Sequence, residues 1–176
     1  MDKKIRIPLI IILALAGTFL FGRFVLKLGG WEYDSFEKFK KDAYLRFTVD
    51  IPEGATNQRF YYKNNGLGER SLYAFTLNRD DYNKFIRSMA AEYHLDSNAN
   101  TGYAEYYMKK VKDIQYPDDP VDSFPMDLDY DKVLSGDISN YDVIIYSPMY
   151  SGSSSCGMIA NPGTGRIVVF NIGNIK

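Results

Sequence analysis

The chain has 176 residues, of which 45% are hydrophobic and 24% are charged, and these values leave room for one globular domain plus an appendage. Its net charge of −1 is uneven, because the first 30 residues carry +4 and the rest carries −5. Nucleic-acid binding depends on neutralisation of phosphates by Lys and Arg, so an acidic domain without a basic stripe argues against DNA or RNA partners, and we set that class aside. A single cysteine, Cys156, excludes an internal disulfide and a cysteine-based zinc site.

Near the N-terminus, the stretch from Ile7 to Gly22 contains sixteen consecutive uncharged residues, and apolar residues resume after Arg23. A helix that crosses ~30 Å of hydrocarbon needs about 20 residues. We therefore predict a transmembrane anchor over residues 7–28, a short cytoplasmic tail over residues 1–6 and a linker over residues 29–34. The membrane is then the first expected partner.

A cleaved signal peptide is the competing interpretation of this segment, because a basic start precedes the small-x-small pattern Ala14-Leu15-Ala16. Cleavage there would leave an apolar region of only about seven residues and would expose a hydrophobic N-terminus. An uncleaved signal anchor fits the sequence better. Cleavage remains open.

Cations lie on both sides of the segment, so charge counting does not decide its orientation. Three precede it and five follow it within about 20 residues, which by itself favours a cytoplasmic domain. We expect the opposite, because three of the five belong to an amphipathic helix and a basic start is typical of exported anchors. The predicted location is a single-pass cell-membrane protein with an extracytoplasmic domain.

The remainder, residues 35–176, is expected to form one domain. Asp34 and Glu37 have capping-box spacing and predict a short helix over residues 35–43. Residues 44–51 are either a strand or an extended connection that ends before Pro52.

Two β-prone runs, residues 59–63 and 70–77, flank an Asn- and Gly-rich loop and predict an antiparallel hairpin. Asn78 then caps a helix that reaches Tyr93 and carries an apolar stripe at helical spacing. A second helix is predicted over residues 102–112, with Thr101 as its cap.

The stretch from Asp113 to Asp137 is rich in Pro and Asp and predicts a long, irregular acidic surface loop. Three strands follow, over residues 143–146, 158–160 and 167–170. The last two flank residues 161–165, whose Pro-Gly pair fits a type II turn. The predicted class is α+β: an antiparallel sheet of about five strands, covered on one face by two or three helices and preceded by one transmembrane helix.

The candidate chemical sites are weak. Asp127, Asp129 and Asp131 alternate like the first ligands of a calcium loop, but Lys132 and Ile138 replace the required Gly and Glu. Exposed Asp clusters are also common in turns, so no metal or cofactor is expected.

Nucleophilic catalysis would need Cys156 or a neighbouring serine beside His94, the only histidine. A carboxylate pair such as Asp118 and Asp119 would suit glycoside hydrolysis only at the right separation, which sequence does not show. No catalytic residue is assigned.

The chain has an unusually high number of tyrosines, fifteen of 176 residues. Tyrosine combines an apolar ring with a polar tip and is common at binding surfaces, although core filling is the alternative. The binding-surface candidates are Tyr61, Tyr62, Tyr103, Tyr107 and Tyr150.

Together these features favour a membrane-anchored extracytoplasmic domain that is non-catalytic and binds a protein or an envelope polymer. Two alternatives stay open. One is a small cell-envelope hydrolase that uses a carboxylate pair or Cys156. The other is an accessory subunit of a membrane complex that makes its contacts through the hydrophobic segment.

Overall fold

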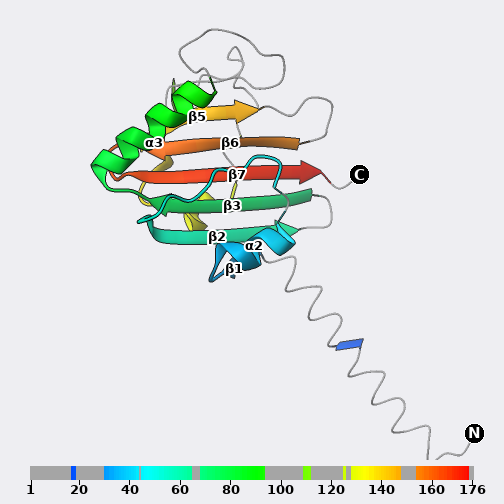
Figure 1. The fold of residues 1–176 in the computed structure, drawn as a ribbon. Coiled ribbons are helices and arrows are strands. Elements are labelled where there is room, and N and C mark those ends of the chain that lie inside the picture. The colour runs from blue at the N-terminus through cyan, green and yellow to red at the C-terminus, as the bar shows by residue number, and fades with distance from the viewer. Residues whose placement is uncertain are drawn as a thin grey trace, which may run out of the picture.

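The computed structural model describes residues 17–18, 30–43, 45–64, 68–93, 109–111, 125, 128–147 and 154–174. They form a seven-stranded antiparallel sheet in the order β1-β2-β3-β7-β6-β5-β4 (Figure 1), which confirms the α+β class. The strands are β1 (Trp31–Tyr33), β2 (Thr56–Asn64), β3 (Gly68–Thr76), β4 (Lys109–Lys110), β5 (Asp142–Ser147), β6 (Ser154–Asn161) and β7 (Arg166–Asn174). The helices are α2 (Phe36–Asp42) and α3 (Arg79–Glu92), and η2 (Tyr130–Lys132) and η3 (Ile138–Asn140) are 3₁₀ turns.

All five predicted strands are present, as β2, β3, β5, β6 and β7, and the predicted hairpin pairs β2 with β3. Two short edge strands were not predicted. One of them, β4, contradicts the end of the helix predicted over residues 102–112, because Lys109 and Lys110 pair antiparallel with β5. Residues 102–108 of that prediction lie outside the described residues.

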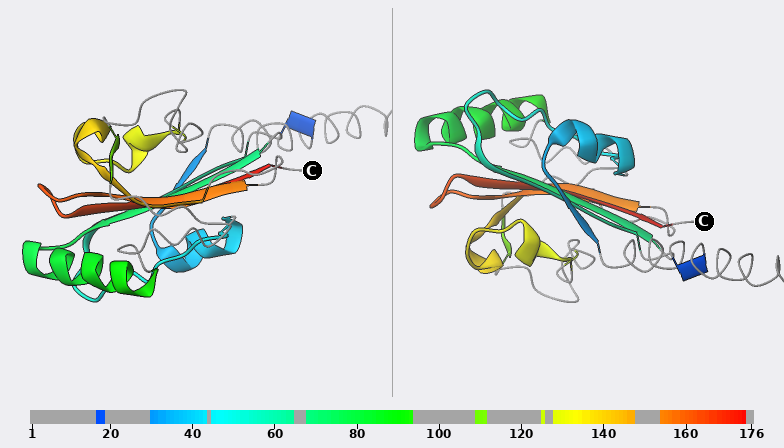
Figure 2. Two further views of the ribbon diagram at one scale, coloured as in Figure 1. Left: turned by 90° about the horizontal axis from the view of Figure 1, so that it is seen from above. Right: turned by 90° about the horizontal axis from the view of Figure 1, so that it is seen from below.

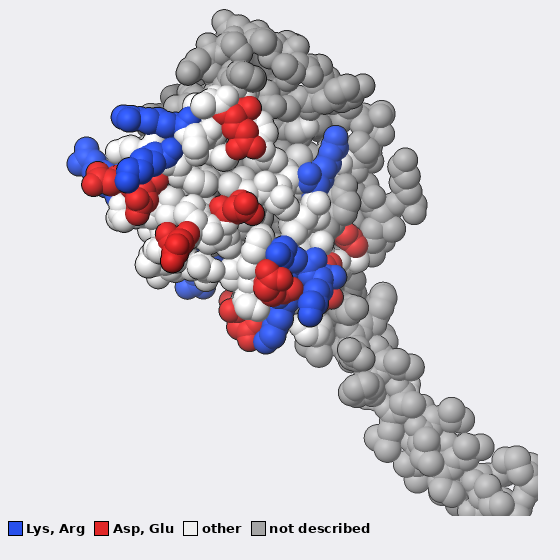
Figure 3. All heavy atoms as spheres, in the orientation of Figure 1, with Lys and Arg blue, Asp and Glu red and all other residues white. Residues whose placement is uncertain are grey.

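The two α-helices lie on the same face of the sheet, which we call the helix face (Figure 2). Charged side chains of both signs lie over the two helices on this face (Figure 3). Asn78 caps α3 as predicted, since its Oδ1 accepts hydrogen bonds from the main-chain N–H groups of Asp80 and Asp81 at 3.1 and 3.0 Å. The capping prediction for α2 is wrong by one residue. Its cap is Ser35, whereas the side chain of Asp34 forms an ion pair with Lys38 at 2.7 Å.

The described residues of the connection before Pro52 form no strand and bend at residues 46 and 47, and side chains of the sheet bind its main chain on the helix face. The hydroxyl of Tyr73 accepts from the N–H of Val49 at 2.6 Å and donates to its carbonyl at 3.0 Å. The buried Asn171 side chain accepts from the N–H groups of Arg46 and Phe47 and donates to the Phe47 carbonyl. These bonds satisfy polar groups that would be costly to bury alone.

The opposite face of the sheet is covered as well, which corrects the prediction of a sheet covered on one face only. The segment of residues 128–141, here called the cover segment, packs on this face (Figure 2) and buries Leu128, Tyr130, Val133 and Tyr141 in a second core. It is irregular, as predicted for residues 113–137. Its described part is nevertheless a packed layer, because apolar residues are spaced among its aspartates.

The β6–β7 turn is not type II. The positive φ lies at Gly165 (+68°), four residues after Asn161, and the N–H of Gly165 donates to the Asn161 carbonyl at 2.9 Å. The Asn161 side chain accepts from the N–H groups of Gly163 and Thr164, as an Asn-led turn does.

The predicted anchor, residues 7–28, lies outside the described residues apart from Gly17 and Thr18. Among the residues that the structure describes, no helix is long and apolar enough to cross a membrane. The anchor therefore stays a prediction.

Candidate functional site: a charged pocket beside the first strand

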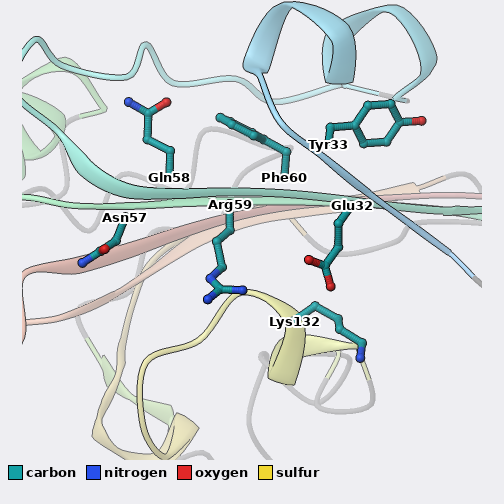
Figure 4. Close-up of a pocket in the computed structure, with 7 residues that line it drawn as sticks. All are labelled: Glu32, Tyr33, Asn57, Gln58, Arg59, Phe60 and Lys132. Atoms are coloured by element: carbon teal, nitrogen blue, oxygen red, sulfur yellow. The ribbon is translucent and has the colours of Figure 1, made fainter.

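The candidate site lies beside the first residues of β2, beyond the point where β1 ends. The three residues of β1 pair only with residues 60–62 of β2, so residues 56–59 have β3 on one side and no described strand on the other. A pocket of about 250 Å³ opens at this edge (Figure 4). It is lined by Glu32, Tyr33, Asn57, Gln58, Arg59, Phe60 and Lys132.

The charged side chains of the pocket gather on one side of the sheet. Glu32 and Arg59 extend from β1 and β2 toward Lys132 on η2, whereas the aromatic rings of Tyr33 and Phe60 point toward the helix face (Figure 4). This separation follows from the alternation of side chains along a strand. The pocket is therefore polar on the side of the cover segment and apolar only on its helix-face side.

Two of these charges have no partner within the described part of the chain. The side chains of Arg59 and Glu32 are exposed and make neither a hydrogen bond nor an ion pair with any described residue. The ammonium of Lys132 lies 3.4 Å from the carboxylate of its neighbour Asp131. The pocket thus presents one carboxylate and two cations, and a ligand of complementary charge can bind them without breaking an ion pair of Arg59 or Glu32 with a described residue.

A buried arginine holds the two walls of the pocket together. The guanidinium of Arg166, 2% exposed, donates to the main-chain carbonyls of Asn57 in β2 and Val133 in the cover segment, and to the Thr76 hydroxyl. Burial lowers the pKa of Arg166, and the nearby Arg59 lowers it further. Hydrogen bonds to a charged donor are stronger than neutral ones, so they fix both walls.

The β2 wall also contains a backbone irregularity. Asn57 has φ +48°, and the pairing with β3 shifts register between Thr56 and Arg59. A bulge of this kind bends the strand and re-aims side chains, and here it lies next to the pocket. The carbonyl of Asn57 accepts from Arg166, which stabilises the unusual conformation.

A second contact joins β2 to the cover segment on the same face. Lys63 forms an ion pair with Asp129, with Nζ to Oδ1 and Oδ2 distances of 3.2 and 3.3 Å, and both side chains are partly buried. Burial raises the pKa of Tyr61 to about 12, and the neighbouring Asp129 adds to the shift. Asp129 thus links the cover segment to β2.

The three aspartates considered as calcium ligands do not form a common site in the described part of the chain. Asp129 is engaged by Lys63, Asp131 is exposed beside Lys132, and Asp127 lies outside the described residues. No group of three or more potential metal ligands occurs within the described ranges.

The tyrosine candidates do not form an exposed face where the structure describes them. Tyr61 is 3% exposed under the cover segment, and Tyr62 is half-buried, with its hydroxyl donating to Glu69 at 3.1 Å. Tyr103, Tyr107 and Tyr150 lie outside the described residues. For Tyr61 the structure favours the core-filling alternative.

Cys156 lies within β6 and is 6% exposed, as expected of a small buried residue in a strand. Burial raises the pKa of its thiol, while Arg46 and Ser147 partly oppose the shift. A catalytic thiol needs the reverse, a pKa lowered by a neighbouring positive charge such as a protonated histidine. The other catalytic candidates, His94, Asp118 and Asp119, lie outside the described residues.

Sequence reasoning missed the pocket, because its charges are single residues from three distant segments. The one local signal was an arginine, Arg59, at the start of a predicted strand. Comparison of the chain with protein-family models, with curated proteins and with solved structures gave no match.

Proposed function

We propose that this chain is a membrane-anchored binding module whose domain lies outside the cytoplasm and captures a protein partner without catalysing a reaction. The observation that carries the proposal is the pocket beside β1, where Arg59 and Glu32 lack partners among the described residues while Arg166 fixes the surrounding walls. Charges held in place on a rigid frame suit recognition of a partner of complementary charge.

The chemistry of the pocket favours an extended polypeptide segment over an uncharged polymer. The edge of β2 beyond β1 has no described neighbouring strand, and its main-chain groups other than the Asn57 carbonyl, which Arg166 occupies, can pair with a peptide segment. The side chains then set the preference. An acidic residue of the partner would face Arg59 and Lys132, and a basic residue would face Glu32.

The test is capture of the partner from intact membranes by chemical crosslinking of the tagged full-length chain. The double variant Arg59→Glu, Lys132→Glu reverses both cations of the pocket. Its matched control, Arg79→Glu with Lys84→Glu, makes the same charge change on exposed residues of α3. Binding through the pocket predicts that the crosslinked partner is lost in the first variant and kept in the second.

Equal capture by both variants would remove the pocket from the proposal. Loss of the partner only when residues 7–28 are replaced by an unrelated transmembrane helix would instead identify an accessory subunit that binds within the membrane. Protease added to intact cells tests the orientation, because only an extracytoplasmic domain is cut.

A further inference from the structure

Trp31 is the only large hydrophobic side chain that is exposed in the described part of the chain, with 39% of its surface accessible. It is the first residue of β1, on the same face of the strand as Tyr33. The ring of Tyr33 packs edge-on against Phe39 of α2 at 5.8 Å and belongs to the helix-face core. Trp31 lies two residues before it, beyond this covered region.

The position of Trp31 is fixed by the residue before it. Gly30 has φ +83°, and a Cβ atom at this position would lie 2.1 Å from the hydroxyl oxygen of Tyr61. Tyr61 is in turn buried beneath the cover segment, next to the ion pair of Lys63 and Asp129. The chain therefore enters the domain through a packed contact, and Trp31 is held by the fold.

Chain length then limits where Trp31 can lie. Only residues 29 and 30 lie between Trp31 and residue 28, the end of the predicted anchor, and three extended residue steps span at most ~10 Å. The headgroup layer on each side of a bilayer is roughly 5–8 Å thick. Trp31 is thus within reach of this layer, where tryptophan is enriched because its ring is apolar and its N–H is polar.

We propose that Trp31 inserts into the lipid headgroup layer and rests the β1 end of the sheet on the membrane surface. This inference depends on the membrane anchoring in the proposed function. In this proposal, lipid is what contacts the exposed indole of Trp31. A partner protein or a second copy of the chain would be a different outcome of the test.

The experiment uses the fluorescence of Trp31, the only tryptophan of the chain. The full-length protein is placed in vesicles of phosphatidylcholine and phosphatidylglycerol, with or without bromine on the acyl chains near the headgroup, and iodide serves as the aqueous quencher. We expect brominated lipid to quench the emission and iodide to have little effect. The control variant, Trp31→Phe with Arg79→Trp, moves the fluorophore to an exposed position beyond the opposite end of β3, where iodide alone should quench it.

Quenching of Trp31 by iodide alone would overturn the inference. Protection from both quenchers would also overturn it, because protein would then cover the ring. Vesicle flotation separates these results from a failure of the proposed function. A chain that floats with vesicles but shows an unquenched Trp31 is anchored with its indole away from lipid, whereas a chain that does not float lacks the anchor itself.

Discussion

The guanidinium of Arg166 and the main-chain carbonyl of Val133 form a two-pronged hydrogen bond, with distances of 3.0 Å from Nε and 2.6 Å from Nη2. The described residues provide no carboxylate partner for this buried cation, and oxygens of Asn57 and Thr76 complete its contacts. A charge that is removed from water is costly unless it is fully hydrogen-bonded. Arg166 therefore binds the cover segment to the sheet.

Replacement of Arg166 by methionine removes these bonds and leaves buried carbonyls unpaired. We expect Arg166→Met to lower the free energy of unfolding by about 2–4 kcal/mol, as measured by urea denaturation. The matched control is Arg59→Met, which removes an exposed arginine nearby and should change stability by less than about 0.5 kcal/mol. Similar losses in the two variants would contradict the structural role of Arg166.

Two glycines with nearly the same backbone angle allow the cost of backbone strain to be measured apart from the cost of a steric clash. Gly30 and Gly54 have φ +83° and +85°, but an added Cβ atom would collide with Tyr61 only at Gly30, and Gly54 has no atom within 4 Å. Gly54→Ala should cost about 1 kcal/mol through its backbone angle alone. Gly30→Ala should cost at least about 1 kcal/mol more, since the ring of Tyr61 must move. Equal thermal shifts would show that the Gly30 contact is loose.

Alkaline pH should unfold the domain. Burial raises the pKa of Tyr33, Tyr61 and Tyr82 to about 12, whereas an unfolded tyrosine titrates near ~10. The folded state then holds more protons than the unfolded state between these values, so the contribution of these tyrosines to the free energy of unfolding is constant below pH ~10 and falls as pH rises toward about 12. Denaturation at stepped pH measures the fall. Tyr61→Phe should make it shallower, and an unchanged slope would count against the shifted pKa.

The thiol of Cys156 should react slowly in the native protein. Its side chain is buried and its pKa is raised, so little thiolate exists at neutral pH and little is accessible. A maleimide reagent should label it at a rate limited by opening of the domain, and fast labelling should follow only in denaturant. Rapid labelling without denaturant would revive the hydrolase alternative.

The sequence patterns that gave correct predictions were local ones. The aromatic and β-branched residues of β2, β3, β5 and β7, the short apolar run of β6 and the apolar stripe of α3 each lie within one element, so local patterns alone revealed them. β1 was missed because three residues are too few to show alternation. β4 was missed because two residues are too few to show a strand pattern in the sequence, and they form a strand only by pairing with β5.

The pocket could not be predicted from the sequence, because it is formed by contacts between residues that lie far apart in the chain. Arg166 follows a turn and has the sequence context of a surface residue, yet its guanidinium lies between the sheet and the cover segment. Glu32, Arg59 and Lys132 meet only after β1 pairs with β2 and η2 packs beneath them. Their long separation along the chain hides this arrangement from sequence reasoning.

The central place of β7 has a consequence for biosynthesis. This strand pairs with both β3 and β6, and its Arg166 lies opposite Thr76, which the ribosome adds 90 residues earlier. Until β7 emerges, β3 lacks one neighbour and the sheet remains in two separate parts. Such non-local pairing slows folding. The sheet therefore closes only after β7 has been synthesised, and a nascent chain that ends before Arg166 leaves the edges of β3 and β6 without their shared neighbour, open to pairing with other chains.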